Sequence, residues 1–218
     1  MPLTSCNALT IVFAKAPVAG TVKTRLIPLL GAEGAATLHR KLLLQTLSAA
    51  VEADLGPVEL HAAPDVRDPF LIDAAKRAGV ALLPQRGDDL GARMSNAFAE
   101  ALARHSRVII IGTDCPVLET RHLTEAGAAL EAGHIGHKAA FIPAEDGGYV
   151  LIALSQWDHL LFDNMRWGTD TVMADTRARL TQLKWRWHEL ETLWDIDRPE
   201  DYRRWSELAL VNEQSRWA

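Results

Sequence analysis

Short runs of consecutive apolar residues alternate along the chain with longer segments whose apolar residues recur at helical spacing. The clearest runs are Ala8–Ala14 and Val108–Gly112, and a continuous apolar run of this length is typical of a strand buried on both faces. Ala32–Ala53 and Leu90–His105 carry apolar residues three or four positions apart, which predicts helices. Such alternation favours parallel strands covered by helices, so we expect one α/β domain over residues 1–218.

The same criteria predict the remaining elements. The other expected strands are Val58–Ala62, Val80–Leu83, Phe141–Pro143, Tyr149–Leu154 and a half-exposed edge strand, Lys184–His188. The other expected helices are Pro69–Ala78, Thr120–Ala132, Thr169–Leu183 and a last helix that Pro199 opens and that continues through Leu208. Ligands of open α/β sheets bind beyond the carboxyl ends of the strands, so the loops that follow each strand are the places to search for a site.

Composition excludes several classes of protein. The chain has 218 residues, of which 48% are hydrophobic and 23% charged, and this is ordinary for a globular protein. The net charge of −5 argues against a nucleic-acid partner, because such binders carry an excess of Lys and Arg. Two cysteines, Cys6 and Cys115, suit a reducing cytosol, so we expect a cytoplasmic protein. No apolar run approaches the roughly 20 residues that span a bilayer, and we expect no membrane association.

The loop after the first strand is basic. It contains Lys15, Lys23 and Arg25, small residues such as Ala14 and Gly20, and no acid. Small residues allow a ligand to approach the backbone closely, and three cations can neutralise a diphosphate. The loop lacks the glycine that precedes the lysine of a Walker A motif. We therefore predict phosphate binding here, and the alternative is a solvated basic loop.

A single carboxylate follows the strand Val108–Gly112. Asp114 lies in Gly112-Thr113-Asp114-Cys115-Pro116, where the glycine and proline can hold it rigidly at the end of the strand. One carboxylate at such a place is a natural ligand for Mg²⁺ or Mn²⁺, which take further ligands from water and phosphates. The alternative is an aspartate that caps the next helix. Cys115 has no base near it in the sequence, so we interpret it as a buried thiol rather than a nucleophile.

A second group of acids lies near the carboxyl end, in Asp195-Ile196-Asp197. In an extended Asp-x-Asp segment one carboxylate faces a site and the other faces away, so either Asp195 or Asp197 can supply a second metal ligand. An exposed helix start is equally compatible with these residues. Asp201 follows Pro199 in the first turn of the last predicted helix, where an acid complements the helix dipole.

The segment after the third strand contains Gln85 and the acid pair Asp88 and Asp89. Gln85 and nearby backbone amides can bind the edge of a nucleobase, and the paired acids can bind ribose hydroxyls. A turn followed by a helix cap explains the same residues equally well. The tryptophans Trp185, Trp187, Trp194 and Trp205 are interpreted as packing residues.

Taken together, these loops carry a family resemblance. Six motifs occur in order: Phe13-Ala14-Lys15-Ala16-Pro17 with Gly20 and Lys23-Thr24-Arg25-Leu26; Asp89-Leu90-Gly91 with Arg93-Met94; Gly112-Thr113-Asp114-Cys115-Pro116; Glu145-Asp146-Gly147-Gly148-Tyr149; Trp167-Gly168-Thr169; and Asp195-Ile196-Asp197-Arg198-Pro199-Glu200-Asp201. The chain resembles the DUF2064 family, transferase-like proteins related to the GT-A nucleotide-diphospho-sugar transferases. It is more distantly similar to molybdenum-cofactor guanylyltransferase and phospholactate guanylyltransferase.

The resemblance implies a GT-A-like Rossmannoid fold, a three-layer α/β/α sandwich with a mostly parallel central sheet. It implies that the amino-terminal half binds a nucleotide or nucleotide-sugar donor and the carboxyl-terminal half a small-molecule acceptor. The nucleotide-binding residues expected are Ala14, Lys15, Gly20, Lys23, Arg25, Gln85, Asp89, Gly91, Arg93 and Thr113. The acceptor-binding residues expected are Glu145, Asp146, Gly147, Gly148, Tyr149, Trp167 and Thr169.

The resemblance also implies a divalent cation, Mg²⁺ or Mn²⁺, on Asp114, with Asp197 preferred to Asp195 as the second ligand. The chain departs from the family pattern at Arg198, which stands where Thr is usual and so removes a good helix N-cap close to Asp197.

The expected function is a metal-dependent glycosyl transfer in which Asp114, Lys23 and Asp146 are catalytic. The metal and the basic loop would offset the charge that grows on the departing diphosphate, and Asp146 or Glu145 would serve as base or hold the acceptor. The first alternative is a nucleotidyltransferase, in which a phosphorylated acceptor attacks a nucleoside triphosphate and pyrophosphate leaves. The second is a nucleotide-binding domain without catalysis.

Overall fold

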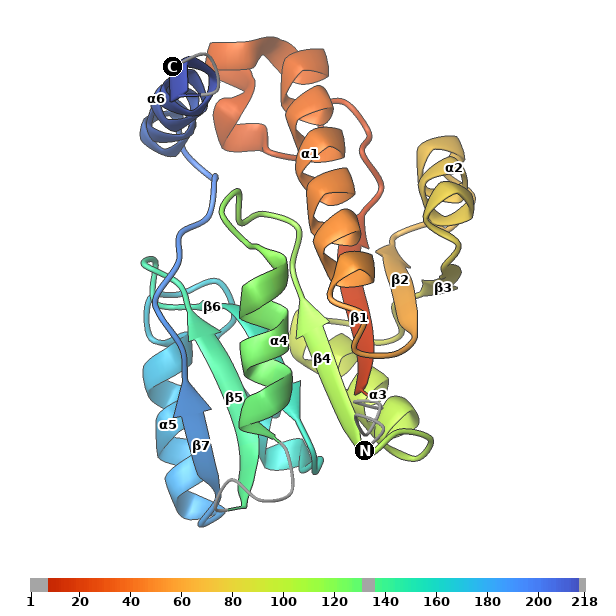
Figure 1. Ribbon diagram of the computed structural model, residues 1–218, viewed down its shortest axis with the longest axis vertical. Helices are drawn as coiled ribbons and strands as arrows, with labels where there is room; N and C mark the ends of the chain where they lie inside the picture. The colour runs from red at the N-terminus through yellow and green to blue at the C-terminus, as the bar shows by residue number, and fades with distance from the viewer. Residues whose placement is uncertain (1–7, 131–135, 216–218) are drawn as a thin grey trace.

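The computed structural model describes residues 8–130 and 136–215, which form a seven-stranded sheet with helices on both faces (Figure 1). Cys6 and Ala132, the predicted end of one helix, lie outside the described residues. The strands are β1 (Ala8–Lys15), β2 (Val58–Ala63), β3 (Ala81–Pro84), β4 (Arg107–Ile111), β5 (His137–Pro143), β6 (Tyr149–Leu154) and β7 (Arg186–Glu189).

The sheet is mostly parallel, as predicted. Its strand order is β3-β2-β1-β4-β6-β5-β7, and β1 pairs in parallel with both β2 and β4. Within the described residues, β6 is the strand that runs against its neighbours, because it pairs antiparallel with both β4 and β5. A tight turn over residues 145–148 joins β5 to β6. The α/β class and the central sheet are therefore those expected from the sequence.

Helices form the outer layers. One face is covered by α1 (Ile27–Glu52), α2 (Pro69–Ala78) and α4 (Thr120–Ala129), and the other by α3 (Leu90–Leu102) and α5 (Val172–Gln182). Figure 1 shows α1 and α4 on the near side of the sheet and α3 and α5 behind it. The last helix, α6 (Pro199–Ser215), lies beside the start of α1.

Each face of the sheet has its own core. Leu43 and Leu47 of α1 and Leu123 of α4 pack on one side, whereas Phe98 of α3 and Leu180 of α5 pack on the other. Because both faces are covered, β1 is buried along its whole length up to Lys15, which explains its uninterrupted apolar sequence. Loss of a large buried side chain such as Phe98 removes both transfer free energy and packing from this core.

Several predicted boundaries are wrong by a few residues. Helix α1 begins at Ile27 rather than Ala32, because a second short helical segment joins it across a kink at Gly31, whose φ is 71°. Helix α3 ends at Leu102 rather than His105. Helix α5 begins at Val172, because the Thr169 hydroxyl donates to the Arg166 carbonyl in a turn before the helix.

Strand boundaries differ as well. β5 begins at His137 rather than Phe141, and β3 begins at Ala81 rather than Val80. β7 covers Arg186–Glu189 instead of Lys184–His188, but it is a half-exposed strand at the edge of the sheet as predicted. Across residues 8–130 and 136–215, no helix is both long enough and apolar enough to cross a bilayer.

Candidate functional site

A cleft of about 600 Å³ lies beyond the carboxyl ends of β1 and β4. The loop after β1 contributes Lys15, Lys23 and Arg25 to its wall, and the loop after β4 contributes Asp114. Segments about ninety residues apart in the sequence therefore meet around one hollow, because neighbouring parallel strands end at the same edge of the sheet.

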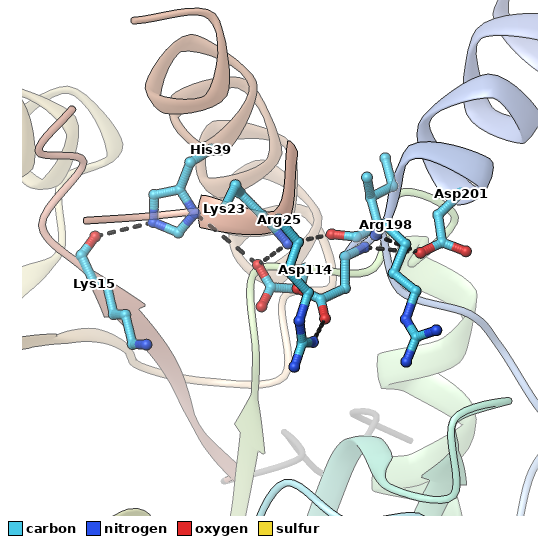
Figure 2. Close-up of polar contacts among 9 residues, drawn as sticks. Lys15, Lys23, Arg25, His39, Asp114, Arg198 and Asp201 are labelled. Carbon is cyan, nitrogen blue, oxygen red and sulfur yellow. Dashed lines mark hydrogen bonds and ion pairs between the residues drawn. The ribbon is translucent and has the colours of Figure 1, made fainter. Parts of the chain in front are cut away.

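Lys23 and Asp114 form the central ion pair of the cleft (Figure 2). Lys23 Nζ lies 2.6 Å from Asp114 Oδ1 and also donates a hydrogen bond to the Ile196 carbonyl. The Lys23 side chain is only 4% exposed, whereas that of Asp114 is 52% exposed. Burial by surrounding protein would raise the pKa of Asp114, but the charge and hydrogen bond of Lys23 outweigh it and hold this pKa below its usual value. Asp114 is thus an ionised carboxylate that faces the cleft.

Asp114 does not cap a helix, so that alternative is wrong. The next helix, α4, begins at Thr120, and its N-cap is Glu119, which forms a capping box with His122. Cys115, next to Asp114, is buried, and burial raises the pKa of its thiol to about 12. A thiol held in this neutral form is inert, as the sequence interpretation expected.

His39 joins the site although the sequence analysis did not select it. Its Nε2 donates to the Lys15 carbonyl at 3.1 Å, and its Nδ1 lies 4.0 Å from Asp114 Oδ1. Burial lowers the pKa of His39, so we assign a neutral ring with the proton on Nε2 and a lone pair on Nδ1 facing Asp114. The residues around His39 in the sequence do not indicate a functional role, because it is the packing of α1 against β1 that brings this side chain to the cleft.

Asp195 and Asp197 both line the cleft. The expectation that one of the two faces away is wrong, because both residues line the same cleft. Arg25 forms an ion pair with Asp197, and Ile196 between the two acids is buried. Burial, followed by the charges of Asp114 and Asp146, raises the pKa of Asp195 to about 7. Asp195 is therefore the acid that shares the electrostatic environment of Asp114.

The helix start after Asp197 is stabilised in spite of Arg198. Asp201 Oδ2 accepts hydrogen bonds from the backbone N–H of Asp197 at 3.0 Å and of Arg198 at 2.7 Å (Figure 2). An acid in the first helical turn that reaches back in this way completes half of a capping box. It holds the backbone of residues 197 and 198 at the start of α6.

Some residues after β3 line the cleft, and others stabilise the start of α3. Gln85 and Arg93 line the cleft, and the Gln85 side-chain amide also donates to the carbonyls of Ala14 and His61, at 3.1 and 2.9 Å. Asp89 is the N-cap of α3, since its carboxylate accepts from the Ala92 N–H at 2.8 Å, as the structural alternative predicts. Gly91 packs against the indole of Trp167, where an added Cβ would lie 2.3 Å from Nε1.

A second pocket of about 220 Å³ adjoins the cleft. The two hollows share Phe13, Leu90, Gly112, Tyr149, Val150 and Asp195. Of the residues expected to bind an acceptor, those that line this pocket are Asp146, Gly148, Tyr149, Trp167 and Thr169. Glu145 pairs with Arg204 through both carboxylate oxygens, at 2.8 and 3.1 Å, and Gly147 packs against the backbone of Asp170.

Comparison with known proteins places this chain in a family. The family model described as "Uncharacterized protein conserved in bacteria (DUF2064)" matches residues 46–169, more than half of the chain. The chain belongs to the DUF2064 family. No curated protein matches it.

Solved structures support the same fold for this DUF2064 chain. A protein from Desulfovibrio desulfuricans G20, described as an inferred nucleotide-diphospho-sugar transferase, is 27% identical, with a TM-score of 0.79 over 96% of this chain and 95% of its own. A nucleotidyl transferase from Methanothermobacter is 16% identical, with a TM-score of 0.66 over 94% and 98%. Glucosyl-3-phosphoglycerate synthase from Mycobacterium tuberculosis, in complex with Mg²⁺ and uridine-diphosphate, is 11% identical, with a TM-score of 0.53 over 90% and 74%.

The acids of the DUF2064 chain suit a metal that is bound partly by its substrate. Across the part of the chain that the structure describes, no three His, Cys, Asp or Glu side chains are grouped to hold a metal ion by themselves. Mg²⁺ is usually held by one or two carboxylates together with waters and substrate phosphates. Asp114 and Asp195 both line the cleft, and the charge of Asp114 raises the Asp195 pKa, so this pair of hard oxygen donors fits that mode of binding.

The raised pKa of Asp195 leads to a prediction for the stability of the DUF2064 chain. An acid whose pKa is higher in the folded than in the unfolded state binds more protons when folded, so its contribution to stability falls as the pH rises from about 4 to about 7. Asp195→Asn removes this dependence. We expect its stability relative to wild type to increase by about 2 kcal/mol between pH 5 and pH 8.

Urea unfolding of both proteins in EDTA at pH 5, 6, 7 and 8 measures this difference. Asp197→Asn is the matched control, because Asp197 lies at the rim and is paired with Arg25. The raised pKa of Asp195 would be contradicted if the free energies of unfolding of wild type and Asp195→Asn differed by the same amount at all four pH values.

Proposed function

We propose that this DUF2064 protein is a divalent-metal-dependent glycosyltransferase that moves a sugar from a nucleotide-diphospho-sugar to a small-molecule acceptor. The observation that carries the proposal is the meeting of Lys15, Lys23 and Arg25 with Asp114 around a single cleft to which a second pocket is joined. The similar structures described above include nucleotidyl and sugar transferases, which supports a transferase.

The basic loop is the proposed diphosphate site. A diphosphate carries closely spaced negative charges, and Lys15 and Arg25 from the loop after β1 offer cations on the cleft wall. Gln85 and Arg93 line the same cleft. Gln85 follows β3, and Arg93 donates a hydrogen bond to the Gly87 carbonyl in the same loop, so we place the nucleoside beside this loop. The cleft volume of about 600 Å³ falls within the range of small-molecule sites.

Asp114 and Asp195 are the proposed holders of Mg²⁺ or Mn²⁺. When bound, the ion would offset charge on the departing diphosphate. Lys23 forms an ion pair with Asp114 and donates a hydrogen bond to the Ile196 carbonyl. It therefore links the loop after β1 to the loop after β4 and to the segment before α6. Asp197, which the family resemblance favours as the second ligand, is paired with Arg25, and we therefore propose Asp195 in its place.

The transfer itself needs an acceptor hydroxyl next to a base. In the proposed step the acceptor oxygen forms a bond to the sugar carbon C1, the bond between C1 and the diphosphate oxygen breaks, and the diphosphate leaves with the electron pair. The hydroxyl proton passes to the carboxylate of Asp146, which lines the second pocket and whose Oδ1 is held by the Gly148 N–H at 2.9 Å.

A donor panel tests the proposal. The protein is incubated with Mn²⁺ and each of several nucleotide sugars, with and without a mixture of small alcohols, and release of the nucleoside diphosphate is measured. We expect release from one donor, dependent on Mn²⁺ and abolished by EDTA.

Two other results would contradict the proposal. Release of pyrophosphate from a nucleoside triphosphate with a phosphorylated acceptor would indicate nucleotidyl transfer. Thermal stabilisation by nucleotides without any turnover would indicate a binding domain, and this stabilisation is measurable even for weak ligands because it grows with ligand concentration.

A further inference from the structure

The geometry points to an acceptor class: we infer that the second pocket takes an uncharged molecule with one apolar ring and a hydroxyl group. This inference rests on the proposed function, because it identifies the partner substrate of the same site. Three observations carry it, namely the size of the pocket, the charge of its walls and the small number of polar groups available to a ligand.

The size of the pocket fits a single ring. Its volume is about 220 Å³, and an apolar protein cavity of roughly 150 Å³ is known to bind benzene. A nucleotide does not fit such a space, but a six-membered ring with one or two small substituents does. The larger, polar cleft next to it has the space that a nucleoside diphosphate requires.

The walls of the pocket are mainly apolar. Its apolar side chains come from the sheet, from the helices behind it and from the loop before α5: Phe13, Leu90, Met94, Ile110, Tyr149, Ile152, Trp167 and Val172. Tyr149 and Trp167 lie edge to face, with ring centroids 6.4 Å apart, and they form a corner against which a flat ring can pack.

The charge of the pocket excludes anionic acceptors. Among the described residues that line it, none is Lys, Arg or His, whereas Asp146 and Asp195 are both present. A phosphate or carboxylate on the acceptor would lose its hydration here and face the Asp146 carboxylate, with no cationic side chain in the pocket wall to pair with. The cations of the site instead line the neighbouring cleft, where the donor diphosphate is proposed to bind.

The polar groups of the pocket are too few for a sugar acceptor. The Thr169 hydroxyl is already hydrogen-bonded to the Arg166 carbonyl and to Thr171, and the Tyr149 hydroxyl contacts Met94 Sδ. Of the two carboxylates, that of Asp146 remains as an acceptor for a ligand hydroxyl, because Asp195 is proposed above as a metal ligand. A ring with several hydroxyl groups would leave most of them unpaired, which disfavours binding. A ring with one hydroxyl directed at Asp146 places its oxygen where the proposed transfer needs it.

Displacement experiments test this inference in the whole protein without a donor. Benzyl alcohol is the probe, and its binding is followed by ligand-observed NMR while benzyl phosphate or a nucleoside, uridine or guanosine, is added as competitor. Because the readout is displacement of benzyl alcohol, phosphate binding in the basic cleft does not count as binding in the pocket. We expect cyclohexanol to displace the probe and benzyl phosphate to be at least about tenfold weaker, as expected for a charge left unpaired.

A pair of variants at one exposed position tests the role of charge. Thr169→Arg adds a cation at the edge of the pocket, and we expect it to strengthen displacement by benzyl phosphate about tenfold. Thr169→Gln has similar reach without charge and is the matched comparison, so we expect benzyl phosphate to displace the probe about tenfold more weakly from it than from Thr169→Arg. Thermal unfolding of both variants verifies that they are folded.

The outcomes separate this inference from the proposed function. Three results would overturn the acceptor class, even if Mn²⁺-dependent nucleotide binding is intact. Benzyl phosphate could displace the probe from wild type as well as cyclohexanol does, a nucleoside could displace it strongly, or benzyl alcohol could fail to bind. Loss of nucleotide binding together with normal benzyl alcohol binding would support the ligand class of the pocket and overturn the donor assignment instead.

Discussion

Asp114→Asn is expected to lower turnover at least about a hundredfold and to abolish the effect of Mn²⁺ on nucleotide binding. Asp114 is the carboxylate at the end of β4 that faces the cleft, and its pKa lies below the usual value because of Lys23, so it is ionised at neutral pH. An asparagine keeps the shape of the side chain but removes the charge that would hold the ion. Calorimetric titration of nucleotide with and without Mn²⁺ measures the change in affinity.

The same substitution also leaves the Lys23 ammonium without its charge partner. Because Lys23 is buried, an uncompensated charge there costs stability, on the order of 2 kcal/mol after allowance for the half-exposed Asp114. Lys23→Met combined with Asp114→Asn removes both charges and should regain most of this stability without regaining activity. The double variant thus separates loss of folding from loss of the metal ligand. If Mn²⁺ strengthens nucleotide binding as much in Asp114→Asn as in wild type, Asp114 is not a metal ligand.

Gly147→Ala is expected to cause the largest loss of stability, about 3 kcal/mol or more, which corresponds to roughly 6–12 °C in melting temperature. A Cβ at this position would lie 2.1 Å from the Asp170 carbonyl oxygen, and the φ of 89° is strained for any residue with a side chain. The Gly147 carbonyl also accepts from the Met173 N–H at 2.8 Å at the start of α5. The turn that carries Asp146 and the helix behind it would therefore have to separate.

Gly79→Ala provides the matched control for this prediction. Gly79 also has a positive φ, 68°, but no atom lies within 4 Å of the position that its Cβ would take. It should lose about 1 kcal/mol, the cost of the backbone conformation alone. Thermal unfolding of both variants compares them directly, and similar losses for the two would show that the contact with Asp170 is unimportant.

The alternation of buried runs and helical spacing was sufficient to predict the fold class, because a strand covered on both faces must be apolar throughout. β1 and β4 follow this rule. Boundaries were less accurate, since they depend on contacts that spacing does not record. The start of α1 before the Gly31 kink and the turn that delays α5 are examples.

The sequence by itself determined which loops carry charge: it indicated Lys23, Arg25 and Asp114, because loops that follow buried strands must meet at one edge of the sheet. Tertiary structure alone decided how these charges are paired. Lys23 contacts the Ile196 carbonyl and Arg25 pairs with Asp197, across 173 and 172 positions of the chain. His39 reaches Asp114 only because α1 packs on β1, and an apolar pocket opens beside Asp146 only because α3, α5 and the sheet meet there. Such pairings depend on three-dimensional distance, and distance between residues far apart in the chain is set by packing rather than by local sequence.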